Sequence, residues 1–176
     1  MTISLYAAIV PSYLQLLGAV GGLLDKAEAY CSQNGIAPEA VIQASLAHDM
    51  LPFGFQVKST VVHSVAAIEA VRTGVFVPDA VPVTDGFAAL RHMILDALAT
   101  LKKVTPEELD SFEGRDVRFQ AGDFRMDFIA EDFLLSFSQP NFYFHATTAY
   151  DILRMKGVKL AKIDYLGGLG GLRLKR

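Results

Sequence analysis

The chain has no tryptophan, only one cysteine and few charged residues. The single thiol, Cys31, excludes an internal disulfide and favours a reducing, cytoplasmic environment. Charged residues make up 20% of the 176 residues and hydrophobic residues 52%, so the apolar content is high. A chain of this length can bury a sizeable core as one domain. Its surplus of apolar residues predicts a subunit interface, most simply that of a homodimer.

A basic face is also missing, since the net charge is −3, and this argues against a nucleic-acid partner. No charged residue occurs between Ile3 and Leu24, a run long enough to span a bilayer. However, the run contains Pro11 and Gln15, and no Lys or Arg precedes it. Its larger apolar side chains recur with helical spacing. We therefore predict the central helix of a bundle and no membrane partner.

Three later segments also carry helical apolar spacing. After a break at Asn34-Gly35, we predict a second helix over about 53–72, a third that ends at about Lys102, and a fourth from near Pro140 to Gly157. Thr84 or Asp85 is the predicted N-cap of the third helix. The intervening stretch 75–86 contains two prolines and is predicted to be a loop.

Residues 116–129 alternate between apolar and polar around Ala121-Gly122-Asp123, which predicts a β-hairpin that packs on the bundle end as a lid. The order of elements predicts an all-α four-helix bundle with this hairpin between the third and fourth long helices. We expect one domain over residues 1–166. The glycine-rich residues 167–176 are predicted to be a flexible basic tail, because they follow no strand and open no helix as a phosphate loop does.

Residues suited to chemistry concentrate on the last predicted helix. Asn141 and His145 are four residues apart and share one helical face. On the second long helix Gln56 and His63 share a face but lie about 10 Å apart along the axis. One small site can therefore use either of them with His145, but hardly both. A cluster of the two amides with His145 competes with a pair of the two histidines. Tyr150 is a further pocket candidate, because its hydroxyl could orient a ligand.

Several stretches resemble a known family. LYAAIVPSYLQLL, LDKAEAY, AHDMLPFGFQV and PNFYFHATTAYDILRMKGVKLAKIDYLG resemble an uncharacterised bacterial family of the DinB/YfiT-like superfamily. Members of this superfamily are four-helix bundles described as metalloenzymes. Their usual metal site takes one histidine from the second helix and a His-x-x-x-His pair from the last. On this resemblance His145 matches the second histidine of the pair, Asn141 the first, and Gln56 the second-helix ligand.

The resemblance thus implies that one metal-binding histidine of three is kept. Zn²⁺ and Ni²⁺ favour imidazole, thiolate and carboxylate ligands, and a carboxamide oxygen is a weak substitute. A divalent metal held by His145, Gln56 and Asn141 is therefore expected to bind weakly. Asp49 or Asp164 could add a carboxylate if the fold brings either one close. No other cofactor is implied, and no catalytic residue can be assigned.

Two functions remain open. The first is a non-catalytic, cytoplasmic dimer with a degenerate polar pocket that either binds a small molecule or only holds the structure together. The alternative is a metal-dependent enzyme of the DinB/YfiT-like type, a hydrolase or thiol transferase, in which His145 holds the metal. The number of good metal ligands separates the two, and a single matched histidine favours the first.

Overall fold

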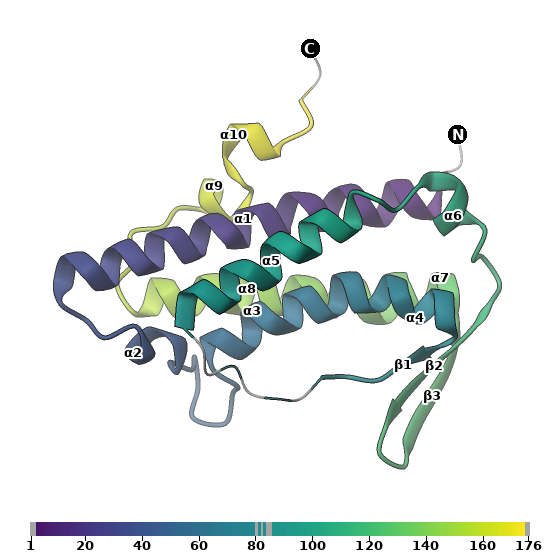
Figure 1. The fold of residues 1–176 in the computed structure, drawn as a ribbon, viewed down its shortest axis with the longest axis horizontal. Coiled ribbons are helices and arrows are strands. Elements are labelled where there is room, and N and C mark those ends of the chain that lie inside the picture. Colours follow the sequence, from purple (N-terminus) through teal and green to yellow (C-terminus); the bar gives the residue numbers. More distant parts are fainter. Residues whose placement is uncertain (1–2, 80, 82, 84–85, 175–176) are drawn as a thin grey trace.

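The computed structural model describes residues 3–79, 81, 83 and 86–174, and Figure 1 shows their arrangement. Four long helical segments pack together, and a hairpin projects from one end of the bundle. The elements are α1 (Leu5–Asn34), α2 (Glu39–Ile42), α3 (Phe53–Val61), η1 (Val62–Ala66), α4 (Ala67–Thr73), β1 (Val75–Phe76), α5 (Gly86–Leu101), α6 (Pro106–Asp110), β2 (Asp116–Ala121), β3 (Phe124–Ile129), α7 (Ala130–Asp132), η2 (Phe133–Ser138), α8 (Gln139–Met155), α9 (Lys162–Tyr165) and α10 (Gly168–Gly171). The predicted order of long helices and hairpin is confirmed.

Helix α1 packs mainly on α5, with further contacts to α8 and α9. The Ser4 hydroxyl accepts a hydrogen bond from the Ala7 N–H and so caps its start, and Gly35 ends it in the left-handed conformation with φ of 62°. Among the described residues, α1 is the one helix long and apolar enough to cross a membrane by length and composition. Half of its most apolar window, 50%, is buried inside the bundle, as a central core helix requires.

Two of the long helical segments contain π-helical turns, which the sequence pattern did not predict. The helix predicted over 53–72 runs from α3 through η1 into α4. The last helix was predicted to begin near Pro140, and α8 does begin at Gln139. What was not predicted is the helical run that leads into it, α7 and η2, which starts at Ala130. Pro140 is the second residue after η2 and lies in the first turn of α8, where a proline is well tolerated.

The hairpin forms as predicted, with Ala121 opposite Phe124 and Gly122 at φ of 59° in the turn. Its aromatic side chains pack on η2: the ring of Phe119 lies 5.3 Å from that of Phe137. The prediction of a loop over 75–86 is wrong at its start, because β1 pairs in parallel with β2. That pairing needs a partner distant in the sequence, which local periodicity does not reveal.

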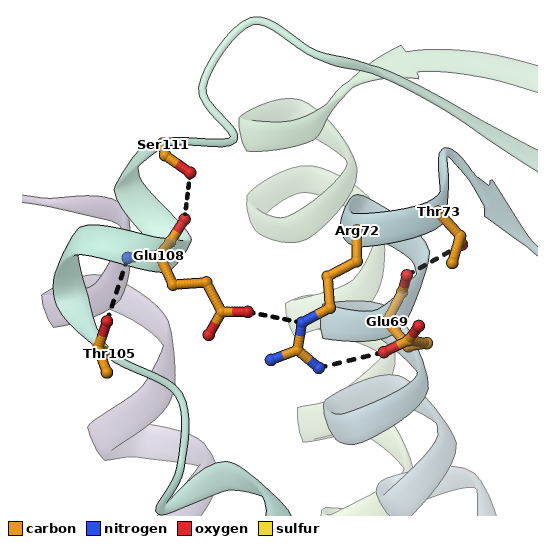
Figure 2. Close-up of polar contacts among 6 residues, drawn as sticks. All are labelled: Glu69, Arg72, Thr73, Thr105, Glu108 and Ser111. Atoms are coloured by element: carbon orange, nitrogen blue, oxygen red, sulfur yellow. Dashed lines mark hydrogen bonds and ion pairs between the residues drawn. The ribbon is translucent and has the colours of Figure 1, made fainter.

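A network of ion pairs holds the connection after α5 against α4 (Figure 2). Arg72 donates from Nε to Glu108 Oε1 at 2.8 Å and from Nη1 to Glu69 Oε2 at 3.1 Å. Thr105 caps α6 by accepting a hydrogen bond from the Glu108 N–H, so both the backbone and the side chain of Glu108 are held. The predicted cap residues of α5, Thr84 and Asp85, lie outside the described residues.

The C-terminal segment returns along α1. Gln15 donates to the Leu166 carbonyl at 3.1 Å, and Lys26 pairs with Asp164 at 2.8 Å. Where a flexible tail was predicted, residues 168–171 form the short helix α10, which Figure 1 shows beyond α9.

Candidate functional site

A buried polar contact joins α3 to α8. These two helical segments pack closely, and Gln56 on α3 is only 2% exposed. Its Oε1 lies 2.7 Å from Nδ1 of His145 on α8, and its Nε2 donates to the Leu51 carbonyl at 2.8 Å. Both polar ends of the Gln56 side chain are therefore engaged.

This arrangement fixes the proton on His145. Because the Gln56 Nε2 donates to Leu51, its Oε1 is the atom that faces His145, and a carboxamide oxygen can only accept. The Nδ1 atom of His145 must then carry the hydrogen. In a neutral imidazole this leaves Nε2 with the free lone pair. The contact therefore orients the ring much as a supporting hydrogen bond orients a metal-binding histidine.

Both histidines of this region are neutral at physiological pH. Burial lowers the pKa of His145 from 6.5 to about 4. Burial, and then repulsion from His145, lower the pKa of His63 from 6.5 to about 4. Burial penalises the charged imidazolium in each case.

His63 lies beside His145, with ring centroids 5.5 Å apart and planes inclined by 16°. The expectation that His145 could meet only one of Gln56 and His63 is therefore wrong. The His145 ring hydrogen-bonds to Gln56 and lies beside the His63 ring, so it lies within reach of both side chains. His63 also packs against Phe76 and Phe137, with centroid distances of 5.4 and 5.8 Å.

The other two pocket candidates have different partners. Asn141 donates from its amide nitrogen to the Phe137 carbonyl at 2.7 Å, one turn earlier in the same helical run. Tyr150 packs on Tyr165, with ring centroids 6.0 Å apart, and lies on another side of α8 from His145. The structure thus brings Gln56 and His145 together, and no described hydrogen bond joins Asn141 or Tyr150 to them.

The residues at the three family positions do not fit a transition-metal site. Two are amides, Gln56 is committed to His145 and Leu51, and the Asn141 nitrogen is committed to its own helix. The possible carboxylates lie elsewhere: Asp164 pairs with Lys26, and Asp49 lies in an exposed turn. Across the described residues, no group of three or more His, Cys, Asp or Glu side chains is arranged to hold a metal.

Two contacts near this site were not predicted from the sequence: Ser138 with His63, and Tyr13 with Phe142. Ser138 donates to the His63 carbonyl at 3.0 Å, and its Oγ lies 3.5 Å from His63 Nδ1. Tyr13 of α1 packs on Phe142 at 4.4 Å, and its buried hydroxyl has no hydrogen-bond partner among the described residues. Burial raises the pKa of this phenol, and the nearby Ser138 hydroxyl offsets part of that rise. The antiparallel register that brings Gln56 to His145 also brings His63 to Ser138, so one correct contact would have found the other.

The helical bundle has a DinB-like fold. A crystal structure of a DinB family member protein from Shewanella denitrificans aligns with a TM-score of 0.79, covering 98% of this chain and 95% of that chain at 24% identity. The chain itself belongs to the family described as domain of unknown function DUF1993, whose family model matches residues 5–166. No curated protein matches the chain.

Proposed function

We propose that this protein is a non-catalytic, dimeric bundle in which the Gln56–His145 pair is a structural contact between α3 and α8. The observation that supports this proposal is the mutual satisfaction of the two side chains. The imidazole donates to the carboxamide, and the carboxamide donates to the Leu51 carbonyl. Buried polar groups arranged in this way are stable without a ligand.

A small-molecule pocket at the same place is less well supported. Among the grooves on the surface of the described residues, five have volumes between about 160 and about 550 Å³. The one of about 550 Å³ is lined by Lys26, Tyr30 and Lys159, among others. None of these five is lined by Gln56, Asn141 or His145. The structural version of the proposal therefore stands ahead of the ligand-binding version.

The dimer and the cellular location belong to this proposal as well. A chain with 52% hydrophobic and 20% charged residues is expected to cover part of its apolar surface with a second copy. Its one thiol, Cys31, is buried and pairs with no other cysteine, which is consistent with a reducing cytoplasm.

One observation favours a second candidate function, a metal-dependent hydrolase or thiol transferase. His63 provides a second neutral imidazole 5.5 Å from His145, measured between ring centroids. Neutral imidazoles are good ligands for divalent transition metals. In that case His63 and His145 would be the protein's donors, and Gln56 would orient His145 rather than bind the metal.

Elemental analysis of protein purified without added metal or chelator separates the two functions. We expect less than stoichiometric zinc, nickel, cobalt or copper, and no rise in melting temperature when zinc is added. One metal ion per chain that is lost in both His145→Ala and His63→Ala, but kept in His92→Ala, would replace the structural proposal with the metal-dependent one. His92 is an exposed control on α5.

A further inference from the structure

Strand β3 is a free edge of the small sheet. The strand order is β1-β2-β3, so β3 has a neighbour on one side only within the described residues. The hairpin extends away from the bundle end, and β3 is not covered by a helix in that view (Figure 1). An exposed edge strand presents unpaired N–H and C=O groups that can pair with another strand.

The hydrogen-bond pattern shows which backbone groups face outward from β3. Ala130 donates its N–H to the Arg115 carbonyl at 2.8 Å, in the same register as the hairpin. Bonded pairs in an antiparallel ladder recur at every second residue. Phe128, Met126 and Phe124 therefore bond inward to β2.

The outward groups belong to the alternate residues of β3, Arg125, Asp127 and Ile129. A second contact agrees with this assignment. Arg118 lies opposite Asp127 and donates its N–H away from β3, to Gly74 at 2.9 Å.

We propose that β3 pairs antiparallel with β3 of a second copy of this chain, around a two-fold axis at Met126. This interface rests on the dimer proposed above and gives it a location. Two β3 strands can bond only where residues with outward backbone groups face each other. For Arg125 and Asp127 this allows three alignments. Arg125 can face itself, Asp127 can face itself, or each can face the other. Only the last alignment places opposite charges across the strands, twice by symmetry, and like charges directly opposite destabilise a sheet.

The two faces of the joined sheet are both complementary in this register. On the polar face Asp127 already accepts from Arg118 Nε at 2.7 Å, and Arg125 of the second copy reaches it from the other side. On the apolar face Phe124, which is 60% exposed, lies opposite Phe128 of the second copy, and Met126 lies opposite its own copy. Charges on an edge strand usually prevent pairing. Here two opposite charges, two residues apart, select one partner and one register.

A cysteine at the axis tests the register directly. Two residues facing each other in a non-bonded antiparallel pair have Cα atoms about 4.5 Å apart, which suits a disulfide. We expect Met126→Cys to form a disulfide-linked dimer under mild oxidation. The matched control is Gln120→Cys on β2, which β3 separates from the axis and which should therefore stay uncrosslinked. The native Cys31 is buried and should not compete.

A charge reversal tests the energetics. In Arg125→Glu, the glutamate of each copy faces Asp127 of the other, so both cross-strand pairs become repulsive. The dimer dissociation constant should therefore rise about tenfold. Lys102→Glu makes the same charge change on an exposed residue outside the sheet and should leave the constant unchanged. Sedimentation velocity across a concentration series measures both.

The outcomes separate the interface from the dimer. A dimer that persists in Arg125→Glu, together with no crosslinking of Met126→Cys, would leave the dimer standing and overturn the β3 interface. A chain that sediments as a monomer at all concentrations would overturn both. Crosslinking of Gln120→Cys as efficiently as Met126→Cys would also overturn the proposed register.

Discussion

Nδ1 of His145 lies 2.7 Å from Oε1 of Gln56, and this contact joins two residues that are 89 positions apart in the chain. It is the clearest polar link between the second and last long helical segments. Since Gln56 is buried and holds the Leu51 carbonyl as well, its side chain couples the start of α3 to the middle of α8.

Removing this carboxamide should therefore destabilise the fold. Gln56→Leu keeps much of the volume but leaves the His145 Nδ1–H without an acceptor, and we expect a loss of about 1–3 kcal/mol in the free energy of unfolding. Gln33→Leu, at an exposed position of α1, should change it by less than about 0.5 kcal/mol. Urea denaturation measures both. Equal effects of the two substitutions would show that the contact contributes nothing.

The histidines should make stability depend on pH. Their pKa values are about 4 in the folded chain, against the ordinary histidine value of 6.5 that applies once the chain unfolds. Between these values the unfolded chain binds more protons, so the free energy of unfolding falls as pH falls from about 6.5 to about 4. Above this window the two groups add no pH dependence.

The slope of the free energy of unfolding against pH reports how many histidines take up a proton on unfolding. Each proton contributes about 1.4 kcal/mol per pH unit at full effect. Denaturation at several pH values should show a shallower slope for His145→Gln than for the native chain, and a still shallower one when His63→Gln is added. A slope that is the same in all three proteins would contradict the assignment to these histidines.

The hydroxyl of Tyr13 should be dispensable. It is buried and has no hydrogen-bond partner among the described residues, so Tyr13→Phe removes a polar group without breaking a bond. We expect thermal stability to stay the same or rise. The matched control is Tyr30→Phe, which deletes a hydrogen bond of 2.9 Å to the Lys156 carbonyl and should cost about 1 kcal/mol. A clear loss of stability in Tyr13→Phe would contradict this and would point to the nearby Ser138 hydroxyl as a partner.

The two glutamates that hold Arg72 should differ in importance (Figure 2). The side chain of Glu108 is 34% exposed and joins α6 to α4, whereas that of Glu69 is 57% exposed and lies on the same helix as Arg72. Glu108→Gln should cost about 0.5–1 kcal/mol, and Glu69→Gln less than about 0.5 kcal/mol. Denaturation in 1 M salt should reduce the difference between the two variants, because the Debye length is then only about 3 Å. The reverse order of effects would contradict this interpretation.

The features that local pattern determines were predicted correctly. Asn34-Gly35 ends α1, and the alternation around Gly122 forms the hairpin, because both depend on nearby residues. Strand β1 and the helical run α7–η2 that precedes α8 were not predicted. The first needs β2 as a partner, and the second depends on how η2 packs against the hairpin.

The candidate site shows the same division. Helical spacing placed Gln56, His63 and His145 on inward faces, and the structure has them adjacent. The sequence could not predict which partner each side chain would contact. Asn141 shares the helical face of His145, yet its amide nitrogen bonds within its own helix, a choice that depends on local geometry rather than on spacing.

The two π-helical turns, η1 and η2, have a consequence for comparing this chain with its relatives. Each turn holds one more residue than an α-helical turn, so it acts as a one-residue insertion within a helix. Positions before and after η1, such as Gln56 and Ile68, therefore belong to two different helical phases about 100° apart. Deleting one residue from η1 alone would rotate α4 relative to α3 and pull Arg72 away from Glu108, without touching either side chain.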